Sequence, residues 1–258
     1  MDINQAFNIF SRAGDIRAAR IITENTRKFS RFRVWKIARQ LRRGVPVAKI
    51  IGKKWFYGLE FYTNRHTLDP RPDTETLVQV AISAAREMHA PRILDLGTGT
   101  GCVLVAILNN VPDATGVGID ISRGARRVAK KNIRDMGLAR RATVRRASFA
   151  RPHAVRKVFD IIVSNPPYIA RGDKRVDAGA QHDPKIALYA RDRGTAAYRA
   201  IAKNAHNWIR PGGILAVEIG AGMTRAVTRI FTDAGWRHTG AYRDMGGITR
   251  VLKFSPKN

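Results

Sequence analysis

The most informative stretch of the sequence is Ile93-Leu94-Asp95-Leu96-Gly97-Thr98-Gly99-Thr100-Gly101. An apolar run of strand length leads into three glycines at alternate positions, and the apolar segment 102–108 follows them. Glycine tolerates the positive φ angles and the close backbone approach that a nucleotide-like ligand requires at the N-terminus of a helix. We therefore expect a buried strand, a ligand-binding loop and a helix in this order.

Asp120 ends the next apolar segment and lies 19 residues after Gly101. A carboxylate at the end of the second parallel strand is placed to accept hydrogen bonds from both hydroxyls of a ribose. Nicotinamide, flavin and adenosylmethionine folds all use a glycine-rich first turn, and Asp120 could instead cap the helix that follows. The two features together favour a ligand that contains adenosine.

Helical and strand-like segments alternate on both sides of this loop. The expected strands are 92–96, 116–120, 143–146, 159–163, 214–219, 236–243 and 248–254. The expected helices lie near 74–89, 101–110, 123–136, 195–208 and 222–234. Such alternation predicts an α/β fold with a seven-stranded, Rossmann-like parallel sheet wrapped by helices.

The chain before the sheet has a different character. Residues 1–43 are basic and have apolar side chains at helical spacing, which predicts a small helical N-terminal domain. Residues 44–72 contain repeated glycine and proline with aromatic residues between them, as expected for a linker with a short hairpin. Residues 73–258 form the domain that carries the sheet.

The chain is strongly basic: 47 Lys and Arg against 20 Asp and Glu give a net charge of +27. Residues 1–50 carry 12 basic and 3 acidic side chains, and residues 123–157 carry 13 and 1. This charge indicates either contact with a polyanion such as RNA or the ribosome, or a compositional drift toward arginine. The two interpretations stay open.

Composition also restricts location and metal chemistry. No apolar run approaches about 18 residues, and the first residues lack the order of a signal peptide. We therefore expect a cytoplasmic protein. Because Cys102 is the only cysteine, neither an internal disulfide nor a cysteine-based metal site is expected.

A second motif, Asn165-Pro166-Pro167-Tyr168, follows the apolar run 158–164. Ligands of open parallel sheets bind at the carboxyl ends of the strands, so this motif should share a crevice with the glycine-rich loop. A rigid exit from a strand is the alternative interpretation.

The residue types in this motif suit alkylation of a planar nitrogen. An amide nitrogen is a weak nucleophile. Its alkylation therefore needs in-line alignment with the alkyl donor and a hydrogen-bond acceptor for each of its two N–H groups. The side-chain oxygen of Asn165 and the backbone carbonyl of Pro166 would accept one each, and the prolines would fix the direction of that carbonyl. Tyr168 would stack on the flat target group and exclude water.

Over residues 42–254 the sequence resembles the HemK-type protein-(glutamine-N5) methyltransferases, which modify the Gly-Gly-Gln glutamine of peptide-chain release factors. The segments 95–101 and 165–169 are also similar to wider adenosylmethionine enzymes, including adenine-N6 methyltransferases. A third segment has a narrower resemblance within the family: Pro70-Arg71-Pro72-Asp73-Thr74-Glu75 resembles the release-factor branch rather than the ribosomal-protein glutamine branch.

The resemblance implies a class I methyltransferase sheet and S-adenosylmethionine as cofactor. The implied cofactor-binding residues are Gly97, Thr98, Gly99, Thr100, Gly101, Asp120, Phe149 and Asn165. Asn165, Pro166 and Tyr168 are the implied catalytic residues, and with Pro167 they would hold the glutamine. The segments Asp183–Leu188 and Arg191–Gly194 resemble family segments beside the site.

The chain departs from the family in three places. Ser148 stands where an acidic residue usually precedes the aromatic residue at 149, the N-terminal helical region is short, and Asp69 stands where an apolar residue is common. Three alternatives stay open: an adenine-N6 methyltransferase, a ribosomal-protein glutamine methyltransferase, and a catalytically weak homologue that binds RNA or the ribosome.

Overall fold

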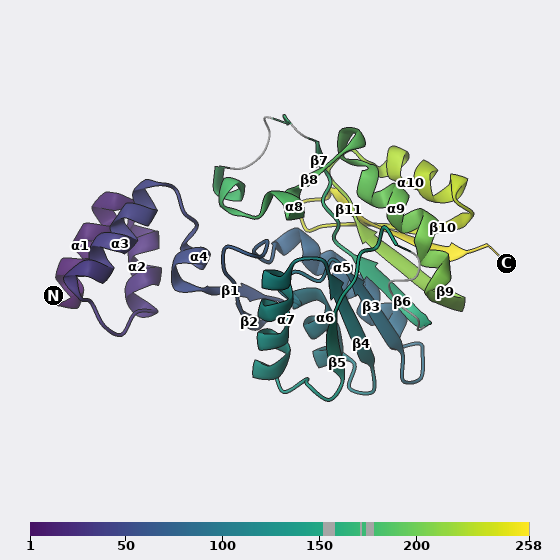
Figure 1. The fold of residues 1–258 in the computed structure, drawn as a ribbon, viewed down its shortest axis with the longest axis horizontal. Coiled ribbons are helices and arrows are strands. Elements are labelled where there is room, and N and C mark those ends of the chain that lie inside the picture. Colours follow the sequence, from purple (N-terminus) through teal and green to yellow (C-terminus); the bar gives the residue numbers. More distant parts are fainter. Residues whose placement is uncertain (152–157, 171, 174–177, 258) are drawn as a thin grey trace.

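The computed structural model describes residues 1–151, 158–170, 172–173 and 178–257. Its centre is a seven-stranded sheet in the order β10-β11-β9-β6-β3-β4-β5, with helices on both faces (Figure 1). The strands are β3 Arg92–Leu96, β4 Thr115–Asp120, β5 Ala142–Arg146, β6 Phe159–Ser164, β9 Ile209–Glu218, β10 Trp236–Arg243 and β11 Thr249–Pro256. The predicted fold class is confirmed.

The sheet is mixed rather than wholly parallel. β3 pairs in parallel with β4 and β6, whereas β11 is antiparallel to both of its neighbours, β9 and β10. Every residue of β6 is buried, as expected for a central strand covered on both faces. The carboxyl ends of β3, β4, β6 and β9 consequently lie along one edge, where a ligand is expected.

Among the described residues, five helices cover the sheet: α5 Glu75–Ala85, α6 Cys102–Asn110, α7 Arg123–Asp135, α9 Ala196–Asn204 and α10 Thr224–Asp233. The first three contribute buried side chains to one apolar cluster, and α9 and α10 contribute to a second. Each of the five lies close to its expected range. α5 begins one residue later than expected, after the 3₁₀ turn η1 Pro72–Thr74, and ends four residues earlier.

β9 begins five residues earlier than expected. The Pro211-Gly212-Gly213 sequence looks like a turn, but it lies inside β9, between Ile209 and Ile214, which both have register partners in β6. The pairing shifts register between Phe159 and Ile161, so that Ile209 and then Ile214 face β6. A bulge in the strand thus accommodates residues that a purely local reading assigns to a turn.

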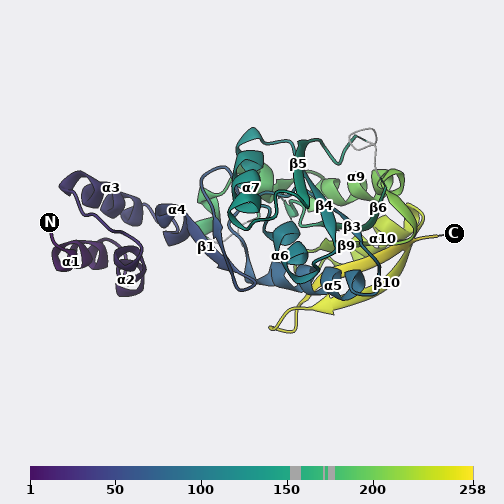
Figure 2. The ribbon, with the colours of Figure 1, turned by 90° about the horizontal axis from the view of Figure 1, so that it is seen from below.

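Three helices, α1 Ile3–Ala13, α2 Ile16–Glu24 and α3 Arg31–Arg42, have a buried apolar cluster of their own. The side chains of Asp2, Asp15 and Ser30 cap their first turns. Figures 1 and 2 both show these helices at one end of the molecule, apart from the sheet.

The segment expected to be a linker contains the hairpin β1 Lys53–Phe56 and β2 Leu59–Tyr62, and also a helix that the sequence does not predict, α4 Val47–Ile51. The division of the chain at residues 43 and 72 stays a prediction.

Short elements lie beyond the exit of β6: β7 Ile169–Ala170, η3 Ala178–His182, α8 Lys185–Leu188, β8 Tyr189–Ala190, η4 Asp192–Gly194 and, after α9, η5 Ala205–Asn207. β7 and β8 pair in parallel as a separate small sheet. Residues 152–157 of the second basic stretch lie outside the described residues. Within the described ranges, none of the helices has the length and apolar character needed to cross a bilayer.

Candidate active site

The glycine-rich loop runs from the end of β3 to the start of α6. Gly97, Gly99 and Gly101 have φ angles of 75°, 54° and 81°, which side chains other than glycine rarely adopt. The Gly97 and Thr98 amides donate to the Ile119 carbonyl at 2.9 and 3.0 Å, so the loop is fastened to the end of β4. A β-carbon at Gly101 would lie 3.3 Å from that of Ala129, so this glycine lets α6 and α7 approach closely.

Asp120 faces the loop from the end of β4. Its Oδ2 accepts from the Gly99 amide at 3.1 Å, and its Oδ1 accepts from the Ser122 amide at 2.8 Å. Burial raises the pKa of this carboxyl above its usual value. The cap of α7 is Ser122, whose hydroxyl accepts from Ala125, so the capping alternative for Asp120 is wrong. The remaining lone pairs of the Asp120 carboxylate are therefore available to a ligand.

Asp95 is a further acidic residue of the site, one that the motif analysis does not single out. It is buried at the end of β3, lines the same cavity and accepts from the Thr98 hydroxyl at 2.6 Å. Burial raises the pKa of its carboxyl to about 7. The sequence does indicate Asp95, because a charged side chain inside an apolar strand is almost never fully buried unless it has a partner.

The Asn165-Pro166-Pro167-Tyr168 segment leaves β6 at the same edge of the sheet. The Asn165 Nδ2 donates to the Thr74 hydroxyl at 3.0 Å. Asn165 and Pro167 line the cavity, whereas Pro166 and Tyr168 do not. The Tyr168 hydroxyl donates instead to Glu218 Oε1 at 3.4 Å, and burial raises the pKa of Tyr168.

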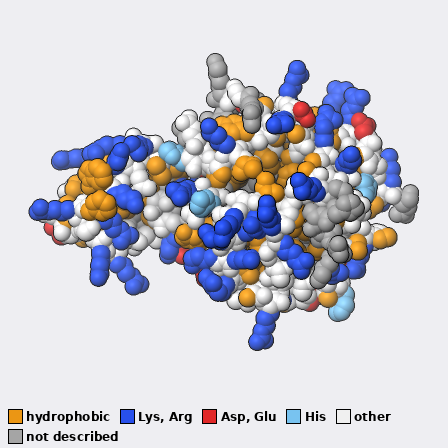
Figure 3. All heavy atoms as spheres, in the orientation of Figure 1, with side chains coloured by type: hydrophobic (Ala, Val, Ile, Leu, Met, Phe, Trp, Pro, Cys, Tyr) orange, Lys and Arg blue, Asp and Glu red, His pale blue; other side chains and the backbone are white. Residues whose placement is uncertain are grey.

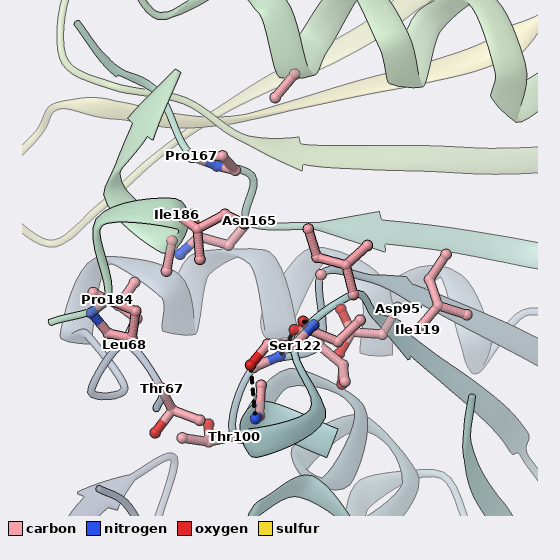
Figure 4. A pocket seen from close by; sticks show the side chains of 18 of the residues that line it. Thr67, Leu68, Asp95, Thr100, Ile119, Ser122, Asn165, Pro167, Pro184 and Ile186 are labelled. Atoms are coloured by element: carbon pink, nitrogen blue, oxygen red, sulfur yellow. Dashed lines mark hydrogen bonds between the residues drawn. The ribbon is translucent and has the colours of Figure 1, made fainter. Parts of the chain in front are cut away.

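The cavity between these segments has a volume of about 340 Å³, which is in the usual range for small-molecule sites. Of the predicted cofactor-binding residues, all but Gly101 line it. Figure 4 shows side chains from the loop, from the exit of β6 and from the segment after Asp183 directed into this one space. Phe149 and Ile119 supply apolar wall.

These residues fit an adenosine-containing sulfonium. Asp120 offers acceptors to ribose hydroxyls, Phe149 offers a flat surface to adenine, and Asp95 offers a carboxylate to an ammonium group. In the part of the chain that the structure describes, no group of three or more His, Cys, Asp and Glu side chains could hold a metal ion.

A buried ion cluster supports the wall of the cavity. The Lys49 Nζ lies 2.8 Å from Asp69 Oδ1 and 2.9 Å from Asp183 Oδ1, and it also donates to the carbonyls of Asn64 and Thr67. Arg71 pairs with the other oxygen of Asp183 at 2.8 Å. Asp69, which departs from the family pattern, is thus the partner of a buried lysine. The cluster fastens α4 and the start of the Asp183–Leu188 segment to the loop before η1.

We predict that Lys49→Met lowers the free energy of unfolding by about 3–5 kcal/mol, because it leaves Asp69 and Asp183 buried without this counter-charge. Urea denaturation measures the change. The control is Lys53→Met, since the exposed Lys53–Glu60 pair should contribute less than about 1 kcal/mol. Equal losses in the two variants would contradict this account of the cluster.

The fold and the site define a class I methyltransferase. Residues 71–182 match the methyltransferase small domain family. The catalytic domain of human Mettl16, solved with an RNA hairpin, superposes with a TM-score of 0.61 at 14% identity, covering 78% of this chain and 77% of that one. A ribosomal protein L11 methylase from Lactobacillus delbrueckii gives a TM-score of 0.54 at 17% identity, covering 72% and 79%. Identities this low establish the fold alone.

The sequence similarity indicates a narrower family than the fold does. The release factor glutamine methyltransferase of Bradyrhizobium diazoefficiens is 41% identical over 223 residues, which are 84% of this chain and 73% of that protein. That of Cereibacter sphaeroides is 40% identical over 225 residues, which are 86% and 78%. The chain belongs to the release factor glutamine methyltransferase family, as its motifs predict. It is 37% identical to a bifunctional methyltransferase of Rickettsia felis and spans about half the length of that protein, 46%.

Proposed function

We propose that this chain transfers the methyl group of S-adenosylmethionine to the side-chain nitrogen of the glutamine in the Gly-Gly-Gln motif of peptide-chain release factors. One observation carries the proposal: the Asn165 amide, held by Thr74, borders the cavity that the glycine-rich loop and Asp120 also line. The names of the relatives point to the same substrate. A cytoplasmic location is part of this proposal.

The proposed roles follow from the chemistry of each side chain. S-adenosylmethionine, when bound, supplies an electrophilic methyl group on a sulfonium. Residues of the glycine-rich loop, with Asp120 and Phe149, hold the adenosine part. The Asn165 Oδ1 accepts a hydrogen bond from one N–H group of the glutamine amide and the Pro166 carbonyl from the other, which aligns its nitrogen. Pro166 does not border the cavity, so this role of its carbonyl requires the segment to shift when substrate binds. Tyr168 does not border the cavity, so its stacking role requires its ring to move when substrate binds.

The test is incubation with isotopically labelled S-adenosylmethionine and a release factor, followed by peptide mapping with mass spectrometry. Label on the Gly-Gly-Gln peptide, and none on a release factor whose motif glutamine is replaced by alanine, supports the proposal. Label on a ribosomal protein, or on adenine of RNA or DNA, would favour the alternatives. No label on any of these, from a folded protein that binds the cofactor, would favour a homologue without activity.

We also propose that the outer face of α3 binds RNA. Phe32 and Trp35 are 72% and 54% exposed, and their rings stack with centroids 6.3 Å apart. The Arg39 guanidinium lies 5.4 Å from the centre of the Trp35 ring. Residues 25–59 contain 11 Lys and Arg and no Asp or Glu. Figure 3 shows apolar and basic side chains together on this part of the surface, a combination that suits stacking of unpaired bases beside phosphates.

Replacing Phe32 and Trp35 together by alanine should weaken binding of a single-stranded RNA by about 30-fold or more, because each of the two stacked bases contributes about 1–3 kcal/mol. Fluorescence anisotropy at several salt concentrations measures it. Ile16→Ala, which removes an equally exposed apolar side chain from α2, should leave affinity unchanged. Unchanged RNA affinity with weakened release-factor binding would assign this face to the protein substrate instead.

A further inference from the structure

Ile186 of α8 is an apolar side chain at the cavity that the proposed chemistry does not yet use. It is 59% exposed, and it also lines the cavity. Among the described residues, two large exposed apolar side chains do both, and the other one is Ile121, which follows Asp120 directly. Single exposed apolar side chains are common on proteins. One that borders a binding cavity is different, because a bound ligand covers it.

The pairing of β7 with β8 places Ile186 near the Asn165–Tyr168 segment. β7 begins directly after this segment, β8 begins directly after α8, and Ile169 of β7 is the register partner of Tyr189 of β8. Ile186 is three residues before Tyr189, and Asn165 is four residues before Ile169. Figure 4 shows the Ile186 and Asn165 side chains on the same side of the cavity. Ile186 therefore borders the part of the cavity where the proposed function places the glutamine.

The chain is held on both sides of Ile186. The buried ion cluster fixes Asp183, two residues before α8, through Lys49 and Arg71. Leu188, the last residue of α8, is buried. Because the backbone is fixed before and after Ile186, this side chain forms a wall that does not retreat easily from a bulkier substrate.

We infer that Ile186 determines specificity for glycine at the position directly before the target glutamine. The inference rests on the proposed function. Glycine has no β-carbon, so the backbone beside the glutamine can pass close to an apolar wall. Alanine at this position adds a methyl group against the Ile186 side chain, and a fixed, packed contact tolerates an added methyl group poorly. Gly-Gly-Gln therefore enters the cavity past Ile186, whereas Gly-Ala-Gln is hindered.

The test compares two release factors, one with Gly-Gly-Gln and one with Gly-Ala-Gln, as substrates of wild type and of Ile186→Ala. Wild type should methylate the Gly-Ala-Gln protein with a kcat/KM about 10- to 100-fold lower. Ile186→Ala removes most of the wall, so the two values of kcat/KM should differ by less than about threefold. The dissociation constants of the two release factors, measured by calorimetry with S-adenosylhomocysteine present, should converge in the same way.

Ile186→Val and Ile16→Ala are the controls. Valine keeps the branched β-carbon, so Ile186→Val should keep a clear preference for Gly-Gly-Gln. Ile16 is 71% exposed on α2 and does not line the cavity, so its replacement should leave the wild-type preference unchanged. In all three variants the dissociation constant of S-adenosylmethionine should stay within about threefold of wild type, because the proposed cofactor contacts come from other residues.

The outcomes separate two failures. A wild-type protein that leaves the Gly-Gly-Gln release factor unlabelled would overturn the proposed function, and this inference with it. Active wild type that methylates both release factors equally would overturn only the role of Ile186. An Ile186→Ala variant as selective as wild type would do the same, because the preference would then come from the substrate backbone. A large loss of S-adenosylmethionine affinity in Ile186→Ala would assign this side chain to the cofactor instead.

Discussion

Replacing Asn165 by alanine is expected to lower the kcat of methyl transfer by about 10²- to 10³-fold, the usual effect of deleting one group that orients or stabilises a reacting centre. The substitution removes the only side-chain acceptor of the Asn165–Tyr168 segment that borders the cavity. The dissociation constant of S-adenosylmethionine should change by less than about threefold, because the proposed cofactor contacts come chiefly from the glycine-rich loop and Asp120. Single-turnover kinetics and calorimetry provide the two values.

Asn110→Ala is the matched control for this variant. Its side-chain nitrogen donates only to the Ala106 carbonyl of the same helix, away from the cavity lining. The control should keep both kcat and cofactor affinity. A loss of cofactor affinity as large as the loss of kcat in Asn165→Ala would contradict the assigned role.

Replacing Asp120 by alanine should raise the dissociation constant of S-adenosylmethionine by about 100-fold or more. Two hydrogen bonds to a charged acceptor contribute about 1.5–3 kcal/mol each, and about 2.7 kcal/mol corresponds to 100-fold. The variant also loses the acceptor that fixes the Gly99 and Ser122 amides. At saturating cofactor its kcat should fall much less than that of Asn165→Ala.

Asp120→Asn and Asp113→Ala complete this comparison. Asparagine keeps one oxygen acceptor, so its effect should lie between those of alanine and wild type. Asp113 is an aspartate outside the cavity lining that accepts from the Ala90 amide, and its replacement should leave cofactor affinity unchanged. If Asp120→Ala binds S-adenosylmethionine with wild-type affinity, the assignment of Asp120 to the ribose is contradicted.

The sequence predicts the sheet well because local patterns determine it. Apolar runs of strand length, separated by amphipathic segments, identify all seven strands of the sheet, and the glycine-rich loop marks the edge where ligands bind. Prediction is weaker where tertiary contacts override local signals. β9 continues past Pro211-Gly212-Gly213 because Ile209 and Ile214, on either side of it, pair with β6, and α4 is too short to leave a periodic pattern.

The site residues, too, are predicted where a local motif contains them and are missed where only tertiary contacts bring them together. The loop glycines, Asp120 and Asn165 belong to motifs, so their spacing in the sequence is enough to identify them. Glu218 accepts a hydrogen bond from Tyr168, which lies far away in the chain, and no spacing reveals this contact. Lys49 likewise meets Asp69 and Asp183, which are 20 and 134 residues further along. The motif also predicts Tyr168 as a site residue, yet its neighbours hold its hydroxyl toward Glu218 and outside the cavity lining.

The most direct measurement is a crystal structure with S-adenosylhomocysteine and a peptide that contains Gly-Gly-Gln. The account predicts that the Asn165 Oδ1 and the Pro166 carbonyl oxygen each lie about 2.7–3.2 Å from the glutamine side-chain nitrogen, in the plane of its amide, and that the cofactor sulfur faces this plane. An Asn165 side chain directed away from the sulfur, with the glutamine nitrogen held by other residues, would contradict it.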